Sequence, residues 1–486
     1  MTAFPTDFGL TAYGGYVPRL RMQRTAIAAA HSWMAPGLRN QAKGQRAFCS
    51  WDEDSVTMAV EAARDALDGR PRTALRSLVL ATTRAPFADL QCASLVASAL
   101  ALPGDVQSRD LGQSQRAGVS GLLDALQSSR GPALYIASDH PSAKPASTQE
   151  LGYGAGAAAF TLGSEGVIAR LVGSASRTNV FVDHFRASNG RHDYYWEERW
   201  IRDEGYAKIV PEAVEAALDD AKVSASEVSH FILGSSLKGI AELVAKKCAI
   251  SSEAISDGLA ETCGYAGSAH PCLMLAKALE KAKANEILVV IGFGQGCDVL
   301  VLRATDAIDS FKPRRGVSGA LADAQVHESY MRLLAYDDGL EFETGMRGEK
   351  QLKTAFTEQY RSAHQLSSFV AGQCTRCGTV QFPQLAYCVS PECHAPASVF
   401  KPAPLFDESA KVLTYTADWL SYHPSPPLYV GFVQFDVGAR LLMEVVDVGE
   451  AGIDVGTPLR MVYRIKDIDK VRGYPRYFWK ATPIVA

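Results

Sequence analysis

Apolar residues recur at helical spacing in segment 110–126, DLGQSQRAGVSGLLDAL, where Val119, Leu122, Leu123 and Leu126 share one face. The polar stretch before them predicts that a buried helix begins near 116–118. A side chain just ahead of a helix start lies in the positive field of the helix N-terminus, which would stabilise an anion such as a thiolate. This chain has Gln115 there, and an amide cannot be acylated.

Helical and strand-like patterns alternate through the first 305 residues. The apolar spacing predicts helices at 52–67, 90–102, 210–221 and 239–248, a turn leading into a helix at 261–279, and buried strands at 75–82, 132–138, 228–233 and 286–291. Segments 152–162 (GYGAGAAAFTL) and 292–302 (GFGQGCDVLVL) share G-[Y/F]-G-x-G, five residues and Leu, at an offset of 140 residues. Each follows a buried strand that follows a long helix. This order predicts an internal duplication and an α/β fold with mainly parallel strands covered by helices.

The last third of the chain has a different pattern. Residues 306–315 are polar and read as a linker, and 329–361 predicts a charged, partly helical arm. From residue 411 onward, apolar and polar residues alternate between turns that contain Gly and Pro. This alternation predicts a small antiparallel barrel.

Composition narrows the functional classes. The 486 residues suffice for two to four domains, and 47% hydrophobic with 21% charged residues is ordinary for a soluble globular protein. The net charge of −4, without a basic block, argues against nucleic-acid and anionic-membrane partners. No apolar run approaches the roughly 20 residues that span a bilayer, and the first 20 residues lack a secretory signal. We therefore expect a cytoplasmic protein.

Four of the ten cysteines form a CxxC-x10-CxxxxC cluster: Cys374, Cys377, Cys388 and Cys393. Two such pairs on tight turns are typical of tetrahedral zinc coordination. Because four thiolates leave no open position, we expect structural zinc, with a metal-free knuckle as the alternative. The six scattered cysteines read as small buried hydrophobes.

Several segments together resemble the thiolase superfamily: 52–67, 110–118 (DLGQSQRAG), 152–162, 264–271 (GYAGSAHP) and 286–298. The similarity is strongest to HMG-CoA synthase and ketoacyl synthase III. The remainder resembles the zinc-ribbon and OB-fold protein that accompanies archaeal thiolases. The resemblance implies a duplicated, five-layered αβαβα body, a homodimer, and coenzyme A as the substrate carrier. It implies two thiolase-like halves, a linker with a helical arm, a zinc ribbon and an OB-fold, at 1–165, 166–305, 306–365, 366–402 and 403–486.

The usual catalytic groups of that family are replaced. Its nucleophilic cysteine falls on Gln115, its histidine on Gly234, and its glycine-asparagine loop on Gly264-Tyr265. The candidate catalytic residues are therefore Gln115, Tyr265 and His270. Gln115 can donate its amide to a developing oxyanion or can simply fill space. Tyr265 can act as acid or base, and His270 either faces the same pocket or turns away from it.

Two further features carry alternatives. Cys263 is either a displaced nucleophile or a buried filler. The aromatic and charged insertion around 183–186 and 193–200 either walls a substrate pocket or forms a solvated dimer-contact loop.

We expect an enzyme that makes or cleaves a C–C bond next to the carbonyl of an acyl-CoA thioester. Its substrate would be a β-keto or β-hydroxy acyl group, and no covalent acyl-cysteine would form, as in retro-aldol or decarboxylative chemistry. The alternatives are CoA-dependent β-keto acyl cleavage or transfer by an unusual mechanism, and a non-catalytic scaffold that channels substrate to a partner enzyme.

Overall fold

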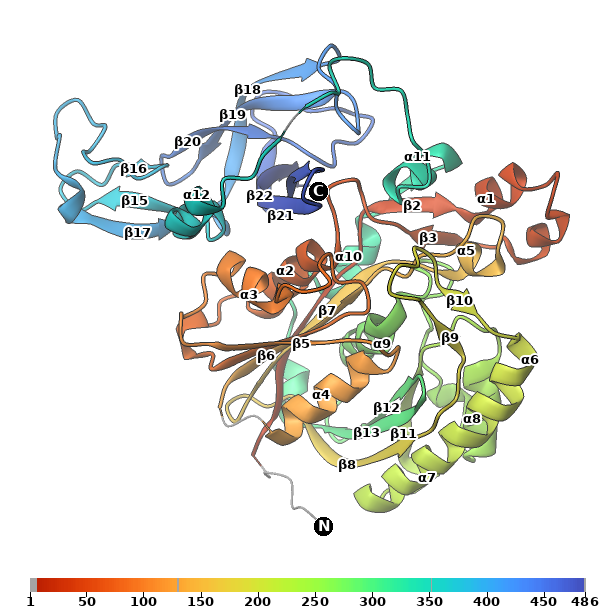
Figure 1. The fold of residues 1–486 in the computed structure, drawn as a ribbon. Coiled ribbons are helices and arrows are strands. Elements are labelled where there is room, and N and C mark those ends of the chain that lie inside the picture. Colours follow the sequence, from red (N-terminus) through yellow and green to blue (C-terminus); the bar gives the residue numbers. More distant parts are fainter. Residues whose placement is uncertain (1–6, 129–130, 351, 485–486) are drawn as a thin grey trace. The chain divides into compact units, whose positions relative to one another are not determined.

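The computed structural model describes residues 7–128, 131–350 and 352–484, and Figure 1 shows the ribbon. These residues form two compact units. The first contains residues up to 50, 54–94 and 103–337, and the second contains 51–53, 95–102 and the chain from 338 onward. The boundary between the two units, after Asp337, falls inside segment 306–365, which the sequence predicts as a linker and helical arm. None of the described helices is long and apolar enough to cross a membrane.

The first unit is built on a nine-stranded sheet. Its order is β11 (Val228–Leu233), β12 (Ile287–Phe293), β13 (Gly296–Ala304), β8 (Ala169–Thr178), β1 (Gly9–Tyr16), β7 (Gly156–Gly163), β6 (Ala133–Asp139), β4 (Ser77–Ala81), β5 (Gln107–Leu111). From the centre outward, β1–β7–β6–β4 and β8–β13–β12–β11 repeat the same sequence of two antiparallel pairs and one parallel pair. This repeat confirms the internal duplication.

The expectation of mainly parallel strands is wrong. Among the described residues of the nine-stranded sheet, only β4 with β5, β4 with β6, and β11 with β12 pair in parallel. The reason lies in the glycine segments, because each of them returns the chain antiparallel to the strand before it. In the second copy, Gly294 and Gln295 form the turn between β12 and β13.

Helices cover both faces and fill the middle of the first unit (Figure 1). They are α2 (Ser55–Ala66), α4 (Ala117–Ser128), α7 (Val210–Ala221), α8 (Ile240–Lys247) and α9 (His270–Leu279). Helix α3 (Cys92–Ala99) begins in the first unit, and its residues from Leu95 onward belong to the second. Helices α4 and α9 contact strands of both copies, whereas α2 contacts only strands of the first copy and α7 only strands of the second. The two copies of the sheet are joined between β1 and β8 by the single residue pair Leu10–Ala169, so they form two sheet layers. The order of layers is helix, sheet, helix, sheet and helix, and α4 lies in the central layer.

Shorter elements complete the first unit. Two small sheets pair β14 with β2 and β3, and β10 with β9. The bounds are β2 (Leu20–Gln23), α1 (Arg24–Ala30), β3 (Gln45–Ala47), α5 (Thr148–Gly152), β9 (His184–Phe185), β10 (Tyr194–Tyr195), α6 (Glu198–Trp200), a π-helix (Ile201–Ile209), α10 (Gly316–Ala322), β14 (Gln325–His327) and α11 (Tyr330–Tyr336).

The second unit contains a three-stranded and a five-stranded antiparallel sheet. The first sheet joins β16 (Val380–Gln381), β15 (Val370–Cys374) and β17 (Phe400–Pro404), and two short helices precede it, α12 (Phe356–Arg361) and α13 (Ala363–Leu366). The second sheet has the order β20 (Arg440–Glu444), β19 (Leu428–Phe435), β18 (Ala410–Asp418), β21 (Pro458–Asp469), β22 (Tyr474–Pro483). The buried ring of Trp479, on the edge strand β22, stacks on the buried ring of Phe369, which directly precedes β15. The antiparallel sheet of the prediction is confirmed, while its closure as an OB-fold barrel stays a prediction.

Candidate functional site

A pocket of about 1060 Å³ opens in the first unit. Its walls are the segments after β4 and β5, the insertion after β8, and the turn between β12 and β13. Strands β4 and β5 are parallel neighbours, so their carboxyl ends meet at one edge of the sheet, which is where α/β folds bind ligands. The volume is in the range of small-molecule and cofactor sites.

Gln115 lines this pocket just ahead of α4. Two glycines allow the backbone around it to approach its neighbours closely. A Cβ on Gly118 would lie 2.0 Å from the Ser268 carbonyl oxygen, and a Cβ on Gly294 would lie 3.1 Å from the Gln115 backbone nitrogen. The backbone from Gln115 to Gly118 therefore lies close to the second-copy loop and to the β12–β13 turn.

Tyr265 contacts Gln115 through its hydroxyl but is not among the residues that line the pocket, so its facing the pocket stays a prediction. Its hydroxyl donates to Gln115 Oε1 over 3.4 Å, which leaves the Gln115 Nε2 group without an acceptor among the described residues. The Tyr265 backbone is fixed by hydrogen bonds to Gly152 and Gly154. Burial, with the charges of neighbouring tyrosines behind it, raises the Tyr265 pKa well above its ordinary value. Tyr265 is therefore a hydrogen-bond donor and a poor base.

His270 lies beside Tyr265, with 5.1 Å between ring centroids, but it does not line the pocket. Its Nε2 is 3.0 Å from the Gly258 carbonyl oxygen, and its Nδ1 accepts from the Ala266 N–H over 3.2 Å. Burial lowers its pKa to about 4. A Cβ on Gly234 would lie 2.8 Å from the His270 ring, so this ring occupies the space beside position 234. This geometry favours the outward-facing alternative for His270.

No cysteine lines the pocket among the described residues. Cys263 is fully buried, its sulfur lies 3.5 Å from the Ala155 carbonyl oxygen, and burial raises its pKa to about 11. Cys272 is buried in the same way, and its pKa is raised to about 12. Neither thiol has the exposed, low-pKa character of a nucleophile.

The insertion after β8 forms a wall of the pocket, which is one of the two alternatives that the sequence left open, the other being a solvated dimer-contact loop. Asp183, His184, Phe185, Arg186 and Asp193 all line the pocket. Two ion pairs, which the sequence analysis missed, order these side chains: His184 Nδ1 to Asp183 Oδ2 at 2.9 Å and Arg186 to Asp193 at 3.2 Å. The only signal in the sequence was the density of charged and aromatic residues, which does not show which side chains pair.

Asp139, at the end of β6, connects two of the loops around the site. Its buried carboxylate accepts from the Thr83 hydroxyl at 2.7 Å and from the Ser268 hydroxyl at 2.7 Å. Thr83 lines the pocket, and Ser268 lies between Tyr265 and His270 in the second-copy loop. Asp139 is therefore a positioning residue for both walls.

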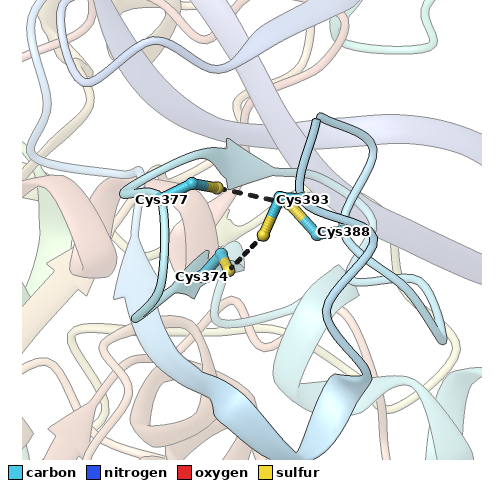
Figure 2. Close-up of side chains that lie close together, drawn as sticks. All are labelled: Cys374, Cys377, Cys388 and Cys393. Atoms are coloured by element: carbon cyan, nitrogen blue, oxygen red, sulfur yellow. Dashed lines mark hydrogen bonds between the residues drawn. The ribbon is translucent and has the colours of Figure 1, made fainter. Parts of the chain in front are cut away.

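The second unit holds the cysteine cluster in two turns (Figure 2). The four sulfurs of Cys374, Cys377, Cys388 and Cys393 all lie within 4.8 Å of one another, and the closest pairs are 3.5 and 3.8 Å apart. Tetrahedral Zn–S bonds of about 2.3 Å place sulfurs about 3.8 Å apart. The cluster therefore fits one zinc ion bound by all four predicted ligands.

Both units contain segments that are similar to known protein families. Residues 218–302 match the family described as 3-oxoacyl-[acyl-carrier-protein (ACP)] synthase III C terminal, and residues 365–398 match the ChsH2 rubredoxin-like zinc ribbon domain. The hydroxymethylglutaryl-CoA synthase of Caldivirga maquilingensis is 25% identical over 338 residues, 68% of this chain and 97% of the relative. That of Aeropyrum pernix is 28% identical over 321 residues, 63% of this chain and 87% of the relative.

Solved structures show the same fold. An HMG-CoA synthase complexed with CoA aligns with a TM-score of 0.61 at 15% identity, covering 72% of this chain and 95% of that chain. The 3-oxoacyl-(acyl carrier protein) synthase III of Pseudomonas aeruginosa PAO1 aligns with a TM-score of 0.54 at 22% identity, covering 62% and 98%. The chain therefore belongs to the thiolase superfamily, with a domain like HMG-CoA synthase and ketoacyl synthase III, and it carries a ChsH2-type rubredoxin-like zinc ribbon in its C-terminal part.

Proposed function

We propose that this protein is an acyl-CoA enzyme that makes or cleaves a C–C bond next to the thioester carbonyl without forming an acyl-cysteine. One observation carries the proposal: Gln115, which the resemblance places where the family has its nucleophile, lines the pocket, while no cysteine lines it among the described residues. CoA is the proposed carrier because its relatives are named hydroxymethylglutaryl-CoA synthases and similar structures hold CoA or 3-hydroxy-3-methylglutaryl coenzyme A.

A β-hydroxy acyl-CoA suits this chemistry. In retro-aldol cleavage, the β-hydroxyl loses its proton, its C–O bond becomes a carbonyl, and the Cα–Cβ bond breaks. The electron pair of that bond moves into the thioester enolate, whose carbon then takes a proton. A malonyl-type thioester, whose free carboxylate is attached to Cα, could form a thioester enolate by losing carbon dioxide. Both routes require a donor at the enolate oxygen, and a preorganised amide donor supplies that stabilisation.

Gln115 and Tyr265 divide the work in this proposal. The Tyr265 hydroxyl donates to Gln115 Oε1 and so fixes the amide with its Nε2 hydrogens free for the enolate oxygen. Because the pKa of Tyr265 is raised, its hydroxyl stays protonated and keeps this role. His270 supports the Tyr265 loop through Ala266.

Acyl transfer through a relocated thiol is disfavoured by the burial and raised pKa of Cys263. The turnover experiment below distinguishes an enzyme from a non-catalytic scaffold. Structural zinc, a homodimer and an OB-fold for the five-stranded sheet complete the proposal, and light scattering tests the dimer.

The test is turnover of a panel of β-hydroxy and β-keto acyl-CoA thioesters, with products separated by liquid chromatography and mass spectrometry. We expect the β-hydroxy acyl-CoA thioesters to release a shorter acyl-CoA together with a carbonyl compound, and a malonyl-type thioester, added to the panel, to release carbon dioxide. Gln115→Ala should lower kcat by about 10²-fold or more with little change in KM, as for loss of one oxyanion donor. Gln127→Ala, on the exposed face of the same helix, is the matched control. CoA binding without turnover of any member would establish the scaffold instead.

A further inference from the structure

His184 and Asp183 form a hydrogen-bonded pair on the pocket wall. His184 Nδ1 is 2.9 Å from Asp183 Oδ2, and both residues line the same pocket as Gln115. The other ring nitrogen, Nε2, has no hydrogen-bond partner among the described residues. A carboxylate on Nδ1 fixes the ring and its tautomer, so that Nε2 is the atom offered to a ligand.

Other groups around His184 support this arrangement. Asp183 Oδ1 is buried with no partner among the described residues, so it can accept from a bound hydroxyl. The ring centroid of Tyr195 lies 6.4 Å from that of His184. Arg186 pairs with Asp193 at 3.2 Å, which leaves Asp183 as the carboxylate that serves the imidazole.

The three candidates for proton transfer that the sequence offers, Tyr265, Cys263 and His270, are poorly suited to it. Tyr265 stays protonated because its pKa is raised, and Cys263 is buried away from the pocket. Both ring nitrogens of His270 are engaged with backbone groups. The C–C chemistry proposed above still needs a base for the β-hydroxyl.

We infer that His184, oriented by Asp183, is the acid–base residue that moves the β-hydroxyl proton of an acyl-CoA substrate in this pocket. This inference rests on the proposed function. His184 Nε2 accepts the hydroxyl proton as the Cα–Cβ bond breaks and the carbonyl product forms. The electron pair enters the enolate held by Gln115, and the imidazolium returns the proton to Cα. Atoms and charge balance without any further reactant.

The charges around His184 set the pH at which it works. Burial lowers the His184 pKa, but the hydrogen bond and charge of Asp183, with Asp193 and Asp139 behind it, outweigh burial and raise the pKa above 6.5. A base must be neutral, so kcat should rise with pH through this raised pKa.

The experiment compares four full-length proteins: wild type, His184→Gln, Asp183→Asn and His230→Gln. His230 is the matched control, because it also pairs with a carboxylate, Glu286 at 2.9 Å, but does not line the pocket. Two readouts are used: cleavage of a β-hydroxy acyl-CoA across pH, and deuterium exchange at Cα of propionyl-CoA. Exchange reports enolate formation even where no bond is cleaved. Circular dichroism and CoA binding check that each variant is folded.

We expect His184→Gln to lower both rates by about 10²-fold or more with CoA binding unchanged. Asp183→Asn should lower kcat less and move the rising limb to lower pH, since loss of the carboxylate lowers the imidazole pKa. His230→Gln should behave as wild type. Wild-type turnover that survives His184→Gln overturns the inference and leaves the proposed function standing. Exchange without cleavage, lost in His184→Gln, supports the inference and overturns the cleavage reaction. Absence of both activities in the wild type overturns both.

Discussion

Two clusters of buried charge, one in each unit, use similar side chains in different ways. In the first unit, Asp183 and His184 line a pocket and leave one imidazole nitrogen free. In the second unit, Lys480 donates to Asp52 at 3.0 Å and to Glu444 at 3.1 Å, and it is 2% exposed. Arg464 meets Glu53 and Asp447 at 3.1 and 2.9 Å. None of these second-unit residues lines the pocket.

The difference lies in what the charges face. A buried ion surrounded by counter-ions is costly to disturb, because removing one partner leaves the others uncompensated. An oriented imidazole beside a cavity loses little stability when it is removed, since solvent or a ligand replaces its contacts. We therefore expect the second cluster to control stability and the first to control rate.

Loss of zinc should cause the largest loss of stability, and this loss should be confined to the second unit. The protein should carry about one zinc per chain, and Cys388→Ser should lose it, because four thiolates are needed to close the site. Hydrogen exchange should then rise in 365–398, while the peptides around Gln115 stay protected. Zinc content is measured by elemental analysis. A variant with full protection and no metal would remove the claim of structural zinc.

Lys480→Met should cost about 3–5 kcal/mol of unfolding free energy, since it removes the buried cation that Asp52 and Glu444 share and leaves them with the weaker contacts of Arg464 and His423. The control is Lys208→Met, which breaks an exposed pair with Glu204 and should cost less than about 1 kcal/mol. Urea unfolding measures both. Equal costs for the two variants would show that the second cluster is not a stability element.

Tyr265→Phe should lower kcat by about 10²-fold with little change in KM, because it removes the hydroxyl that orients Gln115. Tyr153→Phe is the control, since Tyr153 lies in the same group of rings without a hydrogen bond to Gln115. Steady-state kinetics give both values. A larger effect of Tyr153→Phe than of Tyr265→Phe would contradict the assignment.

The smallest expected effects are changes of unfolding free energy with pH. Stabilisation is lost at low pH in the second-unit cluster and at high pH in the first-unit cluster. Burial alone would raise the Glu444 pKa, but His423 and Lys480 outweigh burial and lower this pKa below 4.5. The stabilisation that ionised Glu444 contributes is therefore present above pH 4.5 and is lost as the pH falls through the lowered pKa. The His184 pKa is raised, so the stabilisation that protonated His184 contributes is present below pH 6.5 and is lost as the pH rises through the raised pKa. Urea unfolding of wild type, Glu444→Gln and His184→Gln from about pH 3 to about pH 9 tests both. Variant differences that do not change with pH would contradict these signs.

The sequence predicted the elements whose periodicity is strong. Helix α7 and strand β11 have the predicted bounds, because each carries an unbroken apolar pattern. Strand β8 was missed, since its sequence ARLVGSASRT is half polar and it is recognisable only by pairing with β13. The π-helix at Ile201–Ile209 leaves no spacing signal, because its residues are mostly polar or exposed.

Site prediction failed where long-range packing decides orientation. Gln115 and Tyr265 were correctly expected to meet, because both follow from the positions of α4 and α9. The orientation of His270 depends on the space beside Gly234, which no local pattern records. Asp52 and Glu53 looked like helix-start acids, yet they pair with Lys480 and Arg464 more than 400 positions along the chain, while Asp54 caps α2.

The central claim is that acyl-CoA chemistry proceeds here without an acyl-enzyme. The most direct measurement is the intact mass of the protein, quenched by acid during turnover of a β-hydroxy acyl-CoA. We predict an unmodified mass while product accumulates, because Gln115 cannot be acylated and no cysteine among the described residues lines the pocket. An acyl adduct that forms and decays at the rate of turnover, on Cys263 or on any other residue, would contradict this account and establish a relocated nucleophile.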